Sequence, residues 1–379
     1  MDPNDILGYF QERTDSIVDL IREIVDIESP SRDADRSREV ADWVEAQARA
    51  TGVGLTVERI FVADGNHLVI HAFPGPGQPT LLLGHTDTVH PVGSKLANPT
   101  RVDGDRLYGC GAFDMKANIV LIFEALRFLE SVGEEPSTPL TIVLSCDEEI
   151  GSNTGREVVE DAASSAARCF VMEPSSEGRV KTGRKGTALF TLRAHGVPAH
   201  AGLEPEKGAN AIAELARQIE NVHKSGKPDV GTTVNVCRMN GGTTSNVIPE
   251  FAECEIDVRF ASMLEAERVQ AELGFLKPVD ARVALELTGA INRPPLERTG
   301  NVVDLFNKAQ GLAARFGYEI GETQVGGASD GNFVAALGVP VIDGLGLAGG
   351  GAHTLDEHVF ISDIGRRATL ITSLLMSEP

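Results

Sequence analysis

Three apolar segments of this chain each run directly into titratable side chains, and this pattern limits the possible folds most strongly. The segments are TLLLGHTD (80–87), LTIVLSCDEE (140–149) and ARCFVMEP (167–174). Short, continuous apolar runs are typical of strands that are buried on both faces, as in a parallel sheet covered by helices. The carboxyl ends of parallel strands meet at one edge of the sheet, where ligands bind. The sequence therefore predicts a chemical site built from strand ends.

Helical patterns alternate with these strands in the first half of the chain. Apolar residues recur at helical spacing over 4–27, 34–51, 115–131 and 152–163, and further strands are expected at LTVERI (55–60) and HLVIHA (67–72). Strands that alternate with helices indicate an α/β domain with a mostly parallel sheet flanked by helices. A chain of 379 residues also exceeds the usual size of one domain, so two domains are expected.

The pattern changes near residue 180. Strands at TALFTLRAHG, GTTVNVCRMNGG, FAECEIDVRF and ARVALELTGA, with helices over 207–223 and 263–274, follow the β-α-β-β-α-β order of a ferredoxin-like α+β domain. Strand–helix alternation then resumes. We therefore expect a discontinuous first domain (1–181 and 292–379) that carries an inserted domain (182–291). Lys181, Arg184 and Lys185 fall at the first hinge and are interpreted as a solvated hinge.

Composition excludes several classes of function. The net charge of −21 leaves few basic patches for nucleic acid or an anionic membrane. The five cysteines are odd in number and form no CxxC pair, which argues against a disulfide framework or a zinc finger and favours a reducing cytoplasm. The acidic, amphipathic N-terminus does not look like a signal peptide, and no apolar run reaches the ~18 residues that a membrane span needs.

The polar strand ends carry the residue types of a metal site. Asp114 lies in a glycine-broken loop before a helix, and His353 lies in GLAGGGAHTLDE near the C-terminus. Together with the strand ends, they supply two imidazoles and three carboxylates. Zinc accepts such a mixed set of nitrogen and oxygen donors. One carboxylate shared between two ions would allow a two-metal site. Asp87 is placed to bind the ring nitrogen of His85 that does not contact the metal. His90 is expected to point away.

A set of motifs, in order, resembles the M20 family of di-zinc metallopeptidases, with the glutamate carboxypeptidase (carboxypeptidase G2-like) branch most similar. The motifs are GHTDTV, YGCGAFDMKAN, SCDEEIGS, VMEPS, HGVPAHAG, GGTTSNVIPE, DVRF and GGGAHTLDE. The resemblance implies two Zn²⁺, with Co²⁺ or Mn²⁺ as substitutes. It also implies that the inserted domain is a lid and dimerisation domain, so that a homodimer is expected.

The resemblance implies a role for each matching residue. His85 and Glu173 would hold one zinc, Glu149 and His353 the other, and Asp114 would bridge them. Glu148 would be the general base that moves a proton from the attacking water to the leaving amine. Asp87 would orient His85. Met115 stands where the family usually has an acid, often across a cis peptide.

Three residues of the inserted domain match further functional positions, and two of them have plain structural alternatives. His200 would reach the active site of a neighbouring subunit and stabilise the oxyanion; without the resemblance, a turn cap is the favoured interpretation. Asn246 and Arg259 would bind the carboxylate of the substrate. A strand-end salt bridge of Arg259 with an acid is the alternative.

Three hypotheses about function follow. The first is a di-zinc exopeptidase of the glutamate carboxypeptidase type, which cuts an amide next to a free carboxylate in a small peptide. The second is an N-acyl amino acid deacylase, such as an acetylornithine deacetylase or a succinyl-diaminopimelate desuccinylase. The third is a non-catalytic binding protein on the same scaffold, which would predict loss of a ligand or of the base, and no such loss is seen.

Overall fold

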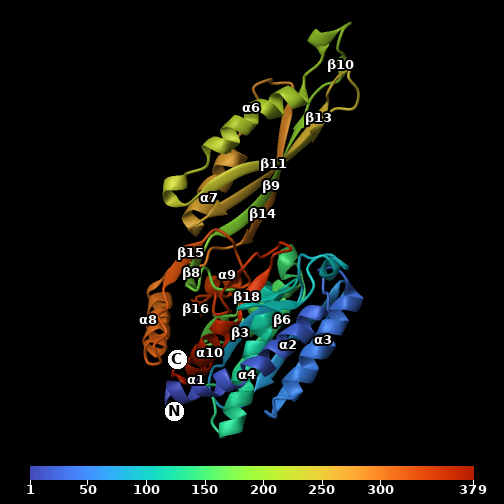
Figure 1. Ribbon diagram of the computed structural model, residues 1–379. Helices are drawn as coiled ribbons and strands as arrows, with labels where there is room; N and C mark the ends of the chain where they lie inside the picture. The colour runs from blue at the N-terminus through green and yellow to red at the C-terminus, as the bar shows by residue number, and fades with distance from the viewer. The chain divides into compact units, whose positions relative to one another are not determined.

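The computed structural model describes all of residues 1–379, and the chain forms two compact units (Figure 1). The first unit comprises Met1–Gly183, Arg298–Gln324 and Ser329–Pro379, and the second comprises Arg184–Glu297 with Val325–Ala328. The first domain was expected to include all of 292–379, whereas residues up to Glu297 and the short segment Val325–Ala328 belong to the second unit.

A six-stranded sheet forms the centre of the first unit, in the order β1-β2-β6-β3-β7-β16. The strands β3, β6, β7 and β16 are parallel, whereas β1 and β2 form an antiparallel hairpin beside β6. This arrangement confirms the predicted α/β class with a mostly parallel sheet. The bounds are β1 Leu55–Val62, β2 Gly65–Ala72, β3 Thr80–His85, β6 Leu140–Ser145, β7 Arg168–Val171 and β16 Val341–Ile342.

Helices cover this sheet, as the apolar stripes in the sequence require. α3 packs against β1 and β2, α5 against β3 and β6, and α9 against β7 and β16; α10 lies between α1 and α4 (Figure 1). The bounds are α1 Pro3–Glu12, α2 Thr14–Asp26, α3 Ala34–Arg49, α4 Ala117–Val132, α5 Gly155–Ala163, α8 Gly300–Ala314, α9 Gly331–Ala336 and α10 Ile364–Met376.

The single helix expected over 4–27 is wrong, because the chain breaks at Arg13 into α1 and α2. The Arg13 guanidinium donates to both oxygens of the buried Glu124 carboxylate on α4. A buried carboxylate needs such a partner, and Arg13, at the junction of the two helices, supplies it. The periodicity alone could not show this.

The first unit also has two smaller sheets. One has the order β17-β18-β5-β4, and the other pairs β15 with β8. Their bounds are β4 Arg101–Asp103, β5 Arg106–Tyr108, β17 Gly349–Gly350, β18 His358–Phe360, β8 Val180–Arg184 and β15 Glu322–Val325. Pairing of β18 with β5 brings the C-terminal segment that contains His353 beside the loop that leads to Asp114.

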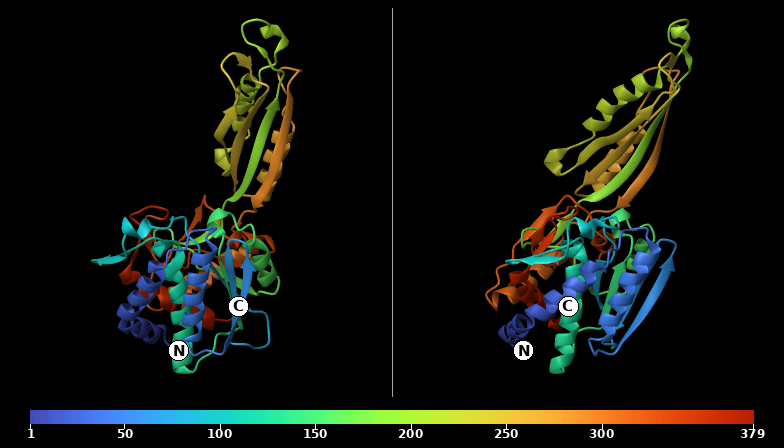
Figure 2. Two further views of the ribbon diagram at one scale, coloured as in Figure 1. Left: turned by 90° about the vertical axis from the view of Figure 1, so that its right-hand side faces the viewer. Right: turned by 45° about the vertical axis from the view of Figure 1, so that its right-hand side comes forward.

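The second unit is an antiparallel four-stranded sheet in the order β11-β13-β9-β14 (Figure 2). Alternate residues of β9 (Ala188, Phe190, Leu192 and Ala194) are buried with apolar residues of α6 and α7, so both helices cover the same face. The bounds are β9 Gly186–His195, β11 Thr233–Gly241, β13 Phe251–Phe260, β14 Ala284–Arg293, α6 Ala211–Lys224, α7 Met263–Gly274 and the short pair β10 Ala199–His200 and β12 Val247–Ile248. This confirms the predicted ferredoxin-like order. No helix of the chain is long and apolar enough to cross a membrane.

Candidate metal centre

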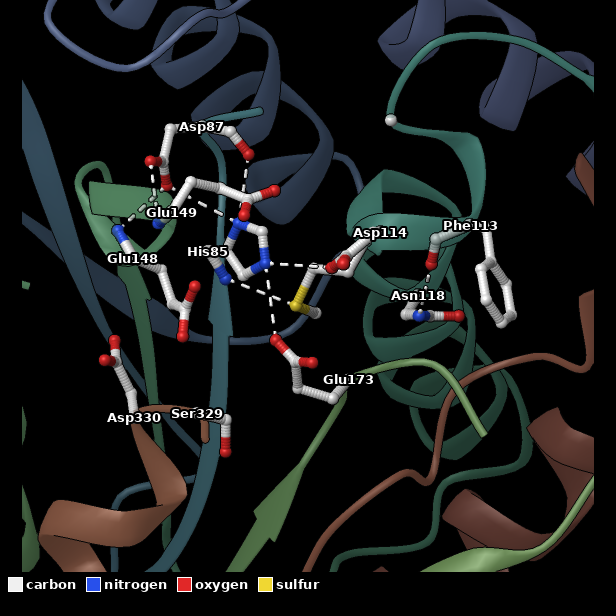
Figure 3. A network of polar contacts seen from close by, with 12 residues as sticks. His85, Asp87, Phe113, Asp114, Asn118, Glu148, Glu149, Glu173, Ser329 and Asp330 are labelled. Atoms are coloured by element: carbon white, nitrogen blue, oxygen red, sulfur yellow. Dashed lines mark hydrogen bonds and ion pairs between the residues drawn. The ribbon is translucent and has the colours of Figure 1, made fainter. Parts of the chain in front are cut away.

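The parallel register places the three polar strand ends side by side. His85, the last residue of β3, is paired with Ser145, the last residue of β6, and Leu83 of β3 is paired with Val171 of β7. The segments that follow β6 and β7 therefore carry Glu148, Glu149 and Glu173 to the side of His85. Figure 3 shows these carboxylates together with Asp114 around the His85 ring.

Asp114 faces both histidines, one with each carboxylate oxygen. Its Oδ1 lies 3.2 Å from Nε2 of His85, and its Oδ2 lies 3.4 Å from Nε2 of His353. Glu173 Oε1 lies 3.4 Å from the same His85 nitrogen, and Glu149 Oε2 lies 3.2 Å from the His353 nitrogen. The five side chains thus form two groups, each with one imidazole and two carboxylates, that share Asp114.

These separations fit a metal ion better than an ordinary ion pair. A charge-assisted hydrogen bond between imidazolium and carboxylate has a typical length of about 2.7–2.9 Å. Two ligands of a tetrahedral zinc, each about 2.0 Å from the metal, lie about 3.3 Å apart. The observed 3.2–3.4 Å agrees with the second value. The buried Oε1 of Glu149 also has no hydrogen-bond partner, as expected of an atom next to an ion site.

The pKa shifts of the site residues also indicate a site for a cation. The His353 ring donates to the carboxylates of Asp114 and Glu149, and these contacts raise its pKa to about 10. Burial opposes protonation of His85, yet the carboxylates of Asp114, Asp87 and Glu173 outweigh it and hold its pKa well above the usual value. Burial likewise opposes ionisation of Asp114, yet its contacts with the two histidines lower its pKa. Metal binding requires neutral imidazoles, so a bound cation would replace these two protons.

Glu148 lies in a group of side chains that are spaced more widely than the histidine–carboxylate pairs described above. A carboxylate oxygen of Glu148 and ligand atoms of His85 and Glu173 all lie within 4.8 Å of one another, and Glu148 is buried. Glu149, the next residue, turns instead toward His353.

Asp87 supports the site through two different contacts. The Nδ1 of His85 is closest to the main-chain oxygen of Asp87, at 3.0 Å, and lies 3.4 Å from its carboxylate Oδ1. The carboxylate accepts the backbone N–H groups of Glu148 and Glu149, each at 3.2 Å, and the Ser31 hydroxyl at 2.6 Å. Asp87 therefore holds the loop of the acidic pair as well as the His85 ring (Figure 3).

The Asp114–Met115 peptide is cis. Met115 fills space beneath the site: its Sδ accepts the His85 backbone N–H at 3.3 Å, and a Cβ added to Gly84 would lie only 2.6 Å from its Cε atom. A side chain at position 84 would therefore displace the Met115 methyl group. The backbone is non-helical at Asp114 and Met115 and becomes helical again at the start of α4.

The remaining predicted residues lie in the second unit. His200 is exposed on β10, and its Nδ1 accepts the backbone N–H groups of Gly202 and Leu203, the contacts of a turn cap. Asn246 is exposed and accepts the hydroxyl of Thr244.

Arg259 lies on β13 and pairs with Asp257, two residues away on the same strand, through Nε and Nη2. The local contacts of His200 and Arg259 are those of the structural alternatives, and they leave the functional roles open.

Lys181 and His90 make buried contacts that the sequence did not predict. Lys181 is only 8% exposed, with its Nζ 4.0 Å from Glu173 Oε2, so it is not a solvated hinge residue. His90, which was expected to point away from the site, is buried and bonded to Glu357. Glu357 is 267 residues from His90, so no local pattern signals that contact. Glu173 precedes Lys181 by eight residues, but no helical or strand spacing links the two side chains.

Comparisons with known proteins agree with this geometry. The profile of peptidase family M20/M25/M40 matches residues 81–377. Carboxypeptidase G2 of Pseudomonas sp. (strain RS-16) is 29% identical over 97% of this chain and 91% of its own length. A succinyl-diaminopimelate desuccinylase of Delftia acidovorans is 32% identical over 76% of this chain and 79% of its own. The crystal structure of aminopeptidase PepT from Bacillus cereus has the same fold, with a TM-score of 0.77 and 20% identity over 96% of this chain and 98% of that one.

The role of Asp87 can be tested with Asp87→Asn. The amide nitrogen would face backbone N–H groups of the acidic pair, so we expect turnover to fall by roughly 10–100-fold, the range found for residues that orient metal ligands. Ser31→Ala removes only one partner of Asp87 and should have a smaller effect. Steady-state kinetics on both variants checks this, and wild-type turnover in Asp87→Asn would contradict it.

Proposed function

This chain belongs to peptidase family M20/M25/M40 and is a metallohydrolase, and from that premise we propose that it is a two-zinc exopeptidase of the glutamate carboxypeptidase type. It would cleave an amide bond next to a free carboxylate in a small peptide or an N-acyl amino acid. The observation that carries the proposal is the shared Asp114, whose two oxygens face one histidine each at 3.2 and 3.4 Å.

We assign the ligands from these distances. His85, Glu173 and Asp114 Oδ1 would hold one ion, and His353, Glu149 and Asp114 Oδ2 the other. When bound, the ions supply Lewis acidity for the amide carbonyl and lower the pKa of a water molecule. Zinc suits the imidazole and carboxylate donors, and Co²⁺ or Mn²⁺ accept the same donors.

Glu148 carries out the proton transfers in this proposal. As a carboxylate it takes a proton from the attacking water, and as the acid it returns that proton to the nitrogen of the leaving amine. Asp87 keeps Glu148 in place because it accepts the Glu148 backbone N–H. His85 keeps its orientation because the main-chain oxygen of Asp87 fixes its Nδ1.

Residues of the second unit complete the proposal. This unit would act as a lid and dimerisation domain. The Nδ1 of His200 accepts two backbone N–H groups, so a neutral imidazole carries its proton on Nε2 and can donate it to an oxyanion in a second copy of the chain. Arg259 and Asn246 would bind the free carboxylate of the substrate.

An N-acyl amino acid deacylase is the second candidate. The specific observation in its favour is the similarity to a succinyl-diaminopimelate desuccinylase, at 32% identity. The similarity to carboxypeptidase G2 covers 97% of the chain, against 76% and 88% for two desuccinylases, and favours the first candidate. Glutamate rather than aspartate at 173 suits either candidate. A panel of γ-glutamyl, folate-like, N-acetyl and N-succinyl substrates would separate them by their kcat/KM values.

Elemental analysis with chelation and Glu148→Gln tests the main proposal. We expect about two zinc ions per chain, activity lost to a chelator and restored by Zn²⁺, and, in the variant, retained metal with turnover lower by roughly 10²–10⁴-fold because the base is missing. Glu149→Gln is the matched control and should lose metal instead. A metal-free, chelator-insensitive chain would support a binding protein, and substantial turnover in Glu148→Gln would remove Glu148 as the base.

Arg259→Ala tests recognition of the carboxylate. A hydrogen bond to a charged group contributes about 1.5–3 kcal/mol, so we expect kcat/KM to fall by roughly 10–100-fold for substrates with a free carboxylate. A carboxamide analogue should be unaffected. Arg238→Ala is the control, because Arg238 is another arginine of this sheet that pairs with a strand acid, Glu255. Equal loss on both substrates would assign Arg259 a structural role.

His200→Asn tests the proposed contribution from a second copy. We expect turnover to fall by about 10²-fold, the cost of one oxyanion donor, with metal content unchanged. His195→Asn is the control, since His195 is also exposed on the second unit and pairs with Glu286. Full activity in a wild-type chain shown to be monomeric by analytical ultracentrifugation would disprove the idea.

A further inference from the structure

Glu357 is a fully buried carboxylate that lies outside the proposed ligand set. Its side chain accepts four hydrogen bonds and has no exposed surface. Oε1 accepts the backbone N–H groups of Phe113 and Asp114, both at 2.9 Å, and Oε2 accepts the backbone N–H of Gly111 at 2.8 Å and Nε2–H of His90 at 2.6 Å. An ionised carboxylate satisfies such donors fully, because it offers only acceptor sites.

The three backbone donors belong to the loop that presents Asp114. Gly111 has a φ of 76°, a left-handed conformation that glycine adopts at low cost, and the N–H groups of residues 111, 113 and 114 converge on one anion. Successive N–H groups of this kind form a concave anion site. Here the chain fills that site with its own carboxylate, which fixes the backbone of the Asp114 loop.

The same carboxylate joins two other segments that carry proposed ligands. His90 follows His85 and Asp87 in the loop after β3, and Glu357 itself follows His353 by four residues. The Gly109 N–H also donates to the main-chain oxygen of Glu357, at 3.1 Å. One buried group therefore connects the chain segments of His85, Asp114 and His353, which are far apart in the sequence.

We propose that Glu357, with His90, is a positioning residue that sets the spacing between the bridging carboxylate of Asp114 and the two histidines. The inference rests on the proposed two-metal site. Asp114 contributes to both ions, so loss of this link should weaken both. The ion held by Asp114 and His353 should be weakened more, because both of these ligands lie on segments that Glu357 anchors directly.

Glu357→Gln is the main variant. The glutamine amide keeps the shape of the side chain but places an N–H₂ group against donors that need an acceptor. We expect the affinity for Zn²⁺ to fall by roughly 10–100-fold, measured by competition with a chromophoric chelator, and the absorption spectrum of the Co²⁺-loaded protein to change. Glu124→Gln is the matched control: Glu124 is equally buried but bonds to Arg13 and Arg127, so stability should fall without a change in metal affinity.

A pair of variants at His90 gives a second test that does not depend on Glu357→Gln folding. His90→Gln keeps an N–H donor near the position of Nε2, whereas His90→Leu removes it. We expect Zn²⁺ affinity about tenfold weaker in His90→Leu and close to wild type in His90→Gln.

The outcomes separate this inference from the proposed function. Wild-type protein that binds fewer than two Zn²⁺ per chain would refute the two-metal site itself. Wild-type protein that binds two, with unchanged affinities and Co²⁺ spectrum in Glu357→Gln or with equal affinities in the two His90 variants, would overturn the positioning role. Weaker binding with an unchanged melting temperature of the metal-free protein would support it most directly.

Discussion

The crowding of carboxylates beside His85 is the constraint on which the first unit depends. Asp114, Glu148, Glu149 and Glu173 come from three different segments, and their charges repel one another strongly in a poorly hydrated site. Without a cation, protons on His85 and His353 have to balance them, which is why the pKa of each imidazole is raised. A donor set that needs so much positive charge is suited to divalent ions.

A surrounding layer of buried carboxylates keeps that set in place. Asp87 accepts N–H groups of the Glu148–Glu149 segment, Asp147 accepts those of Thr154 and Gly155 at the start of α5, and Glu357 accepts those of the Asp114 loop. Loop N–H groups that are buried need acceptors. The same bonds that satisfy the loops therefore fix the positions of the proposed ligands and of the base.

Much of this architecture could be predicted because it depends on local patterns. Apolar runs that end in acids gave the parallel strands, and helical spacing located α7 and most of α3 and α4. Prediction failed where a distant partner decides the outcome. Glu124 on α4 binds Arg13 at the break between α1 and α2, and Glu357 binds His90. None of these partners is within reach of a local window, so no periodicity could reveal them.

The sequence by itself determined which chemistry is available: imidazoles and carboxylates at strand ends, no thiolate cluster, and a family resemblance that the comparisons confirm. Only the tertiary structure decided how these groups are divided between the two proposed ion sites. His85 and His353 are separated by most of the chain, and only the fold brings Asp114 between them with one oxygen toward each. The physical reason is that a ligand set depends on distances of a few ångströms, and sequence spacing fixes such distances only within one helix or strand.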